Sequence, residues 1–115
     1  ARTNGDANAT LDVSTATTGN IDKDTTDSDV FILTGTTQDD LDDLSDVITS
    51  IGNVTTTAND EFIIVVNNAA GTQAGIYLAD TALANSGAAL TAAELALIGI
   101  VNTDAALEAG DFAIA

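Results

Sequence analysis

Apolar side chains recur every three or four residues between about residues 38 and 51, the spacing that places them on one face of an α-helix. This stripe consists of Leu41, Leu44, Val47, Ile48 and Ile51. Thr37 is the expected N-cap, Asp39 and Asp40 fall in the first turn, where carboxylates suit the helix dipole, and Gly52 supplies a stop. The pattern predicts one amphipathic helix over about 38–51.

Short apolar or alternating runs elsewhere are typical of β-strands. Residues 10–18 alternate, with Leu11 and Val13 on one side, whereas residues 61–66 are too continuously apolar to be exposed on both faces. Gly99 marks a bulge or a close contact. The strands predicted in this way are 10–18, 30–33, 54–57, 61–66, 74–79, 95–101 and 112–115.

The segments between these strands read as turns or loops. Residues 67–73 predict a hairpin turn, and residues 80–89 a loop. Thr91 and Glu94 have the spacing of a capping box and predict one short helical turn. The aromatic side chains expected to mark the core are Phe31, Phe62, Tyr77 and Phe112.

These elements predict a mainly β fold, namely an antiparallel β-sandwich or curled sheet with one covering helix. A chain of 115 residues is expected to form one domain. We expect residues 1–18 to form an N-terminal arm or strand, with a possible role between subunits. Residues 19–115 then form a single β-rich domain.

The charge balance changes the picture of possible partners. The chain has eighteen acidic residues but only two basic ones, Arg2 and Lys23, for a formal net charge of −16. This balance argues against nucleic acid and anionic membrane surfaces, both of which need clustered Lys and Arg. No apolar run approaches the roughly 18 residues of a membrane span. With neither Cys nor His, the chain lacks disulfides, thiolate metal sites and the commonest zinc ligand, and we expect no enzyme.

Four carboxylates fall close together in one polar loop and are the candidate ligands for calcium, the one cofactor that the sequence indicates. Ca²⁺ binds six to eight oxygen ligands, which such loops supply. No central Gly or closing bidentate Glu is present, so a solvated acidic loop and a weak calcium site remain equal alternatives. The four residues are Asp22, Asp24, Asp27 and Asp29.

A second acidic group lies on the predicted helix. Its spacing creates like-charged pairs four residues apart, which destabilise a helix slightly unless salt or divalent ions screen them. A solvated helix face is the favoured interpretation, because acid–base catalysis needs a desolvated carboxyl beside a pocket. The group comprises Asp39, Asp40, Asp42, Asp43 and Asp46.

The predicted strand edges have few of the usual safeguards against pairing with another chain. Edge strands are commonly protected by Lys, Pro, bulges or covering segments, yet this chain has no Pro and one Lys. The N-terminal arm could therefore add itself to the sheet of a neighbouring copy through main-chain hydrogen bonds. Pairing within its own domain is the alternative, and the charge of −16 opposes association. The candidate self-assembly residues are Thr10, Leu11, Val13 and Thr15.

From about residue 60 onward the chain resembles the C-terminal region of bacterial proteins exported by type I secretion, the group that includes repeats-in-toxin proteins. The motifs that carry the resemblance are EFIIVV at 61–66, AGIYLAD at 74–80, LTAAELALIGIV at 90–101 and DAALEAGDFAIA at 104–115. The secretion-signal-like terminus is Asp111, Phe112, Ala113, Ile114 and Ala115. The Asp/Gly nonapeptide repeats are missing, and residues 80–94 have lost most oxygen ligands of the family's calcium loop, so no calcium β-roll is expected.

The resemblance implies export to the cell exterior by the type I machinery, without an N-terminal leader. A chain that lacks Met fits an initiator trimmed before Ala1, although a removed signal peptide or an excised fragment explains it too. The sequence thus predicts a secreted, non-enzymatic structural protein that self-assembles into an extracellular filament or surface layer by strand pairing. The alternative is a calcium-dependent adhesive module, or the secretion-signal domain of a larger exoprotein.

Overall fold

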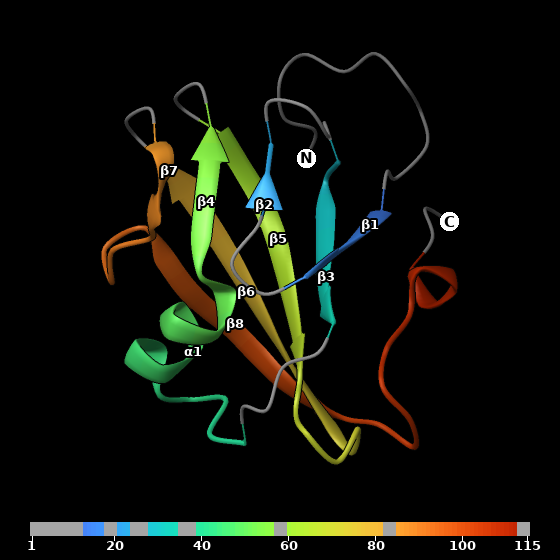
Figure 1. Cartoon of the computed structure of the whole chain (residues 1–115). Helices are drawn as coiled ribbons and strands as arrows, with labels where there is room; N and C mark the ends of the chain where they lie inside the picture. Colours follow the sequence, from blue (N-terminus) through green and yellow to red (C-terminus); the bar gives the residue numbers. More distant parts are fainter. Residues whose placement is uncertain are drawn as a thin grey trace.

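The computed structural model describes residues 13–17, 21–23, 28–34, 39–56, 60–81 and 85–112. Within them the chain forms two β-sheets, one α-helix and one short 3₁₀ helix, η1 (Ala109–Asp111) (Figure 1). The mainly β class with a single α-helix, predicted from the sequence, is confirmed.

The larger sheet has five strands in the spatial order β1-β3-β5-β6-β8. Their bounds are β1 (Val13–Thr17), β3 (Val30–Thr34), β5 (Asp60–Asn67), β6 (Gln73–Thr81) and β8 (Leu95–Asn102). The first three run parallel, whereas β6 is antiparallel to β5 and β8 is antiparallel to β6. The sheet is therefore mixed, and the antiparallel arrangement that we predicted holds only on its β5-β6-β8 side.

The parallel pairs arise from crossovers that the strand patterns do not reveal. Parallel neighbours cannot be joined by a tight turn and need a connection that returns the chain to the same end of the sheet. Here β2 (Ile21–Asp22) lies between β1 and β3 in the chain, while α1 (Leu44–Ile51) and β4 (Asn53–Thr56) lie between β3 and β5.

The smaller sheet corrects one prediction. Its order is β2-β4-β7, and β7 (Asn85–Ala89) occupies part of the segment predicted as the loop 80–89. β7 pairs antiparallel with β4, and Gly87, at φ +86°, is the additional residue where the register shifts. Small residues carry no apolar alternation, so this strand depends on its partner rather than on a local pattern.

The helix begins at Leu44, not near residue 38. Asp43 is its N-cap, because the Asp43 side chain accepts hydrogen bonds from the amides of Ser45 (3.0 Å) and Asp46 (3.3 Å). Thr37, the predicted cap, lies outside the described residues. Gly52 ends the helix at φ +73°, as predicted. In the described parts of the chain, no helix has the length and apolar character needed to cross a membrane.

Leu41 explains the late start of the helix. Its side chain is buried, and its carbonyl accepts a hydrogen bond from the buried Tyr77 hydroxyl on β6. This contact holds the chain before α1 in a turn, so that residues 39–43 approach the sheet without being helical.

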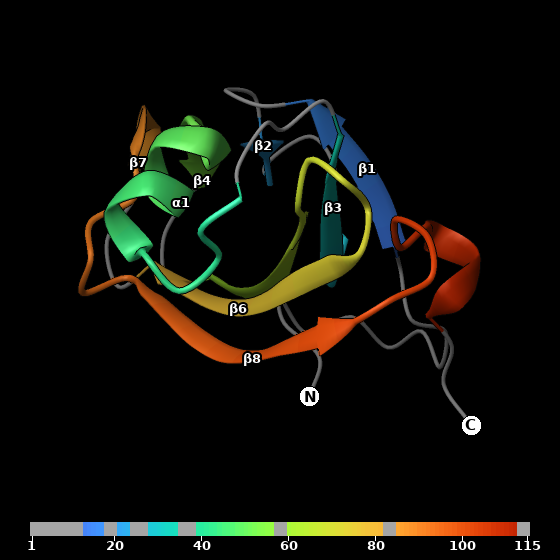
Figure 2. The ribbon, with the colours of Figure 1, turned by 90° about the horizontal axis from the view of Figure 1, so that it is seen from below.

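The main core fills the space between the two sheets and α1 (Figure 2). Figure 2 shows β6 and β8 as a curved layer, with α1, β4 and β7 on its concave side. Phe31 and Phe62 meet edge to face, with ring centroids 5.6 Å apart, and Tyr77 is fully buried. Three of the four aromatic core predictions are therefore confirmed.

A second apolar cluster lies on the opposite face of the larger sheet. It consists of Val30, Ile32, Val65 and Ala74, against which the partly buried Leu107 and Phe112 pack. Phe112 follows η1 and is not in a strand, so the terminal strand predicted at 112–115 is wrong for its first residue. Residues 113–115 lie outside the described residues.

Candidate functional site

The strand β8 presents the most distinctive surface of the molecule. Among the described residues, the large hydrophobic side chains that remain exposed all lie on this strand: Leu97 (36% exposed), Ile98 (60%), Ile100 (39%) and Val101 (41%). Exposed apolar side chains that gather in one place, rather than scattered singly, mark interaction sites.

β8 is also an edge of the larger sheet. It pairs with β6 on one side, and among the described strands none pairs with its other side. Its eight residues, LALIGIVN, include no charged residue and no Pro. The main-chain hydrogen-bonding groups on its free side and its apolar side chains are therefore both available to a partner along the same strand.

A bulge at Ile98 is the one edge-blunting feature within this strand. Ile76 pairs with Gly99 and Tyr77 with Leu97, so that Ile98 has no opposite residue on β6. The sequence predicted either a bulge or a close contact at Gly99. The bulge is present one residue earlier, at Ile98. The close contact is absent, because no atom lies within 4 Å of the position that a Cβ of residue 99 would occupy. The bulge divides the free edge into two short stretches and turns Ile98 outward.

The predicted self-assembly residues lie at the opposite edge of the same sheet. Val13 pairs with Val30 and Thr15 with Ile32, so on that side β1 pairs with β3 of the same chain. The Thr15 side chain is exposed. Thr10 and Leu11 lie outside the described residues, and a role of this segment between copies stays a prediction.

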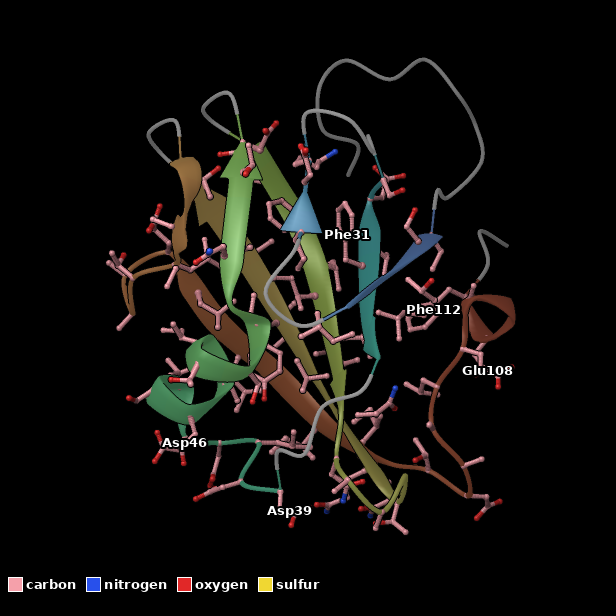
Figure 3. All side chains as sticks on the ribbon, viewed as in Figure 1. Phe31, Asp39, Asp46, Glu108 and Phe112 are labelled. Atoms are coloured by element: carbon pink, nitrogen blue, oxygen red, sulfur yellow. The ribbon has the colours of Figure 1, made fainter. Side chains whose placement is uncertain are left out.

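The C-terminal segment lies beside β1 (Figure 3). Asn67 holds it, because the Leu107 amide donates to the Asn67 side-chain oxygen (2.8 Å) and the Asn67 side-chain amide donates to the Leu107 carbonyl (3.2 Å). Glu108 and Asp111 cap η1 reciprocally. Of the secretion-signal-like residues, Asp111 thus ends η1 and Phe112 packs on the sheet, while Ala113, Ile114 and Ala115 lie outside the described residues.

A groove of about 860 Å³ separates this segment from the sheet. It is lined by Thr15, Ile32, Leu33, the turn at 67–71 and residues 104–108. Asp104 and Glu108 supply the carboxylates of the lining, Thr15 a hydroxyl, and the remaining side chains are apolar or carry an amide. The groove is the seam along which residues 104–108 meet β1, β3 and the β5–β6 turn.

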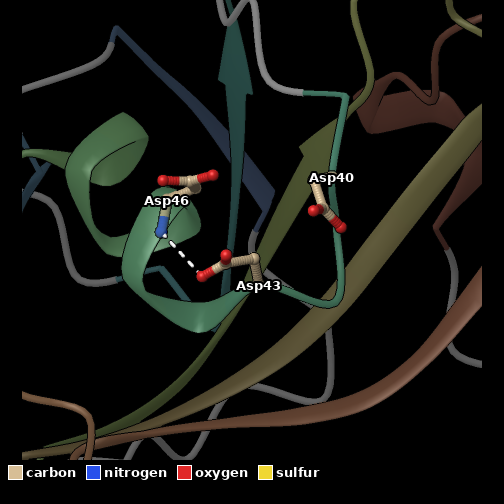
Figure 4. A group of neighbouring side chains, drawn as sticks. All are labelled: Asp40, Asp43 and Asp46. Atoms are coloured by element: carbon tan, nitrogen blue, oxygen red, sulfur yellow. Dashed lines mark hydrogen bonds between the residues drawn. The ribbon is translucent and has the colours of Figure 1, made fainter.

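Three carboxylates gather at the start of α1 (Figure 4). Oxygen atoms of Asp40, Asp43 and Asp46 lie within 4.8 Å of one another, and all three residues are exposed. A hydrogen bond with Asp42 and the nearby negative charges raise the pKa of Asp40 above its ordinary value. The sequence indicated this acidic group but placed its members on a helix face, whereas the turn before α1 brings them together.

This group could hold a metal ion, but its chemistry is that of a loose site. One oxygen from each of three exposed carboxylates leaves most of the six to eight ligands of Ca²⁺ to water. Asp43 already accepts two amide hydrogen bonds as the N-cap. The arrangement therefore concentrates negative charge without a formed coordination shell.

The predicted calcium loop is described only at its two ends. Asp22 closes β2 and Asp29 precedes β3, and both are half-buried. Asp24 and Asp27 lie outside the described residues, so this calcium site stays a prediction.

Comparisons with known proteins found no match: no protein-family model, no curated protein and no solved structure matches the chain. The resemblance to type I-secreted proteins therefore stays a prediction from the sequence.

The β8 surface is what our sequence reasoning missed. We predicted the strand but assigned no role to its exposure, because an apolar run predicts a buried strand as readily as an exposed edge. The available signal was an eight-residue apolar strand free of charge in a chain of net charge −16.

Proposed function

We propose that this chain is a secreted, non-enzymatic structural subunit that self-assembles into an extracellular filament or surface layer by strand pairing between copies. The observation that carries the proposal is the free edge of β8, where the exposed large apolar side chains of the described residues coincide with an unpaired strand edge. Main-chain pairing gives such an edge affinity for another strand, and apolar contact adds to it.

Charge supports self-association through this surface in particular. Each copy has a net charge of −16, so most approaches of two copies are repulsive. β8 has no charged residue, so the strand itself adds no charge repulsion to a contact between two copies. Association through β8 leaves the acidic start of α1 exposed to solvent.

The test is assembly of the full chain, followed by sedimentation velocity and electron microscopy over a range of protein and salt concentrations. The edge variant is Ile98→Lys/Val101→Lys, and the control is Ala69→Lys/Ala109→Lys, at two exposed positions outside β8 and the residues that flank it. Both variants change the net charge from −16 to −14 and so weaken general repulsion.

We expect the wild type and the control to assemble and the edge variant to remain monomeric, with circular dichroism showing that all three are folded. A wild-type chain that stays monomeric even in about 1 M salt, where the screening length is about 3 Å, would exclude the proposed function. Equal assembly of the edge variant would exclude β8 as its surface.

Export is a separate part of the proposal and is supported by the sequence resemblance of residues 60–115. In a host with a type I exporter, we expect the chain to reach the medium and a chain truncated after Asp111 to remain in the cell. Equal export of the truncated chain would remove the secretion-signal role of residues 112–115.

The alternative function, a calcium-dependent binding module, is supported by the closeness of Asp40, Asp43 and Asp46. It predicts heat on calorimetric titration with Ca²⁺ that is lost in Asp40→Asn/Asp46→Asn, or in Asp22→Asn/Asp29→Asn, but kept in the control Asp104→Asn. No heat and an unchanged melting temperature at millimolar Ca²⁺ would rule this function out.

A further inference from the structure

We infer that two copies join by antiparallel pairing of β8 with β8 of the second copy, about a two-fold axis normal to the sheet. This contact is closed and uses the β8 edge of both copies, so growth of a filament or layer beyond the dimer needs a second contact surface on each copy. This inference rests on the proposed function, because it specifies which edges meet when copies associate.

The two edges of the larger sheet are not equally available. η1 lies beside β1, and Phe112 packs against the same outer cluster as Val13 (Figure 2). Thr15 also lines the groove closed by residues 104–108. The helix α1 also contacts β8, but from the concave side of the sheet (Figure 2). Among the described strands none pairs with the free edge of β8, and the large apolar side chains of β8 remain exposed. A β8 edge therefore meets another β8 edge more readily than it meets β1.

Two copies could join their larger sheets by pairing β8 with β1 or β8 with β8, and strand direction distinguishes these two arrangements. β1, β3 and β5 run in one direction, and the two antiparallel steps through β6 return β8 to that same direction. A head-to-tail sheet with one face kept outward would thus pair β8 with β1 in parallel. A two-fold axis instead pairs β8 with β8 in antiparallel, the more stable ladder per residue.

The apolar surface of β8 suits a symmetric contact. In a two-fold interface each residue meets the same patch on the other copy, so an uncharged apolar patch is its own complement. Ile98, Ile100 and Val101 need no oppositely charged partner, and none of the eight residues of β8 repels its counterpart by charge.

Charges at the two ends of β8 oppose the contact without preventing it. Glu94 precedes the strand and Asp104 follows it shortly, and an antiparallel pair brings the Glu94 end of one copy near the Asp104 end of the other. Because these charges are alike, salt strengthens the dimer. The bulge at Ile98 interrupts the ladder, so pairing is centred on one side of it.

The experiment exploits the absence of Cys from the chain. Single variants place Cys at exposed positions along β8: Ala96→Cys, Ile98→Cys, Ile100→Cys and Asn102→Cys. In an antiparallel pair, a residue k positions from the axis is displaced along the strand by about 2k × 3.4 Å from its counterpart, in addition to the strand spacing of about 4.8 Å. We expect disulfide-linked dimers whose yield peaks at one position and falls along the strand, with Ala69→Cys and Thr15→Cys as unlinked controls.

A head-to-tail assembly gives a different result. Equivalent β8 residues would then be separated by five strand spacings, roughly 24 Å, which no disulfide spans. No β8 variant would link to itself, and mixing a β8 variant with Thr15→Cys would yield mixed dimers. That outcome overturns the two-fold pairing and leaves the proposed function intact.

Other outcomes separate the two proposals further. A chain that remains monomeric overturns both. Linked β8 dimers that form no larger particles support the two-fold pairing and exclude the filament or surface layer. Nitroxide labels at the same Cys positions report the distances between copies without forming a bond. Labels that never approach within about 20 Å of each other, near the roughly five-strand spacing of the head-to-tail arrangement, exclude the two-fold contact.

Discussion

The side chain of Tyr77 lies directly over Gly75, two residues earlier on the same face of β6. A methyl group on Gly75 would lie 2.6 Å from a ring carbon of Tyr77 and would also overlap its hydroxyl oxygen, closer than nonbonded atoms approach. The hydroxyl in turn donates a hydrogen bond to the Leu41 carbonyl before α1. The absence of a side chain at Gly75 therefore allows one aromatic side chain to join the sheet to the turn that starts the helix.

Gly75→Ala is expected to destabilise the fold by about 1–3 kcal/mol, because Tyr77 must move from its packed position. Urea unfolding followed by circular dichroism measures the difference. Gly110→Ala is the matched control, since nothing lies within 4 Å of a Cβ at that position. A Gly75→Ala variant as stable as this control would show that the Tyr77 side chain has room to shift.

Tyr77→Phe tests the hydrogen bond to Leu41 and its dependence on pH. Near neutral pH the variant should lose about 0.5–1.5 kcal/mol of stability. Burial, with the charges of Asp42 and Asp40, raises the pKa of Tyr77 from 10.0 to about 12. The unfolded chain therefore releases this proton at lower pH than the folded chain does, and wild-type stability falls as pH rises from about 10 to about 12.

The Phe variant should lack that part of the decline, so the two stabilities converge or cross above pH 10. Because the chain has one Tyr and no Trp, tyrosinate absorbance follows this group alone. A titration midpoint near 10 in the folded protein would contradict the effect of burial.

Asp43→Ala removes the N-cap of α1 and is expected to cost about 0.5–2 kcal/mol. The amides of Ser45 and Asp46 lose their side-chain acceptor, and neither gains another within the helix. Asp43→Asn retains an acceptor oxygen and should keep most of the stability. Thermal unfolding of the three proteins provides the measurement, and equal losses in Ala and Asn would assign the effect to charge rather than to capping.

Asn67→Ala is expected to release the C-terminal segment from the sheet. The variant loses both hydrogen bonds to Leu107, while Asn67→Asp keeps an acceptor for the Leu107 amide and loses the donor to its carbonyl. Hydrogen exchange at residues 104–112 should accelerate most in Ala and less in Asp, with β3 amides unchanged. Unchanged protection at Leu107 would mean that packing of Leu107 and Phe112 alone holds the segment.

Self-association is expected to strengthen with salt. Raising ionic strength from about 0.01 M to about 0.15 M shortens the screening length from about 30 Å to about 8 Å and so weakens repulsion between two copies of charge −16. Sedimentation equilibrium across this range should show a falling dissociation constant. Weaker association at higher salt would instead indicate an interface held by opposite charges.

The parts of the fold that the sequence predicted are those with a local signature. The stripe containing Val47 and Ile51 predicted the helix, and both side chains are completely buried. Continuous apolar runs predicted β3 and β5 within a residue or two. The missed elements had no such signature: Thr37 and Asp43 are both acceptable N-caps by residue type, and β7 consists of small residues whose pairing with β4 is a long-range event.

The acidic group and the β8 surface show the same division at the candidate sites. Spacing indicated that Asp39 to Asp46 were close in sequence, but the turn held by Leu41 decided which carboxylates meet. The residues of β8 predicted a strand, but only the sheet order made that strand an edge.

By itself the sequence determined where strands and a helix form and how much negative charge the protein carries, because periodicity and charge are properties of neighbouring residues. The tertiary structure decided strand order and direction, and with them which apolar strand has a free side. The physical reason is that nearly every residue carries the same main-chain N–H and C=O groups. The sequence of a strand therefore does not specify which other strand it pairs with.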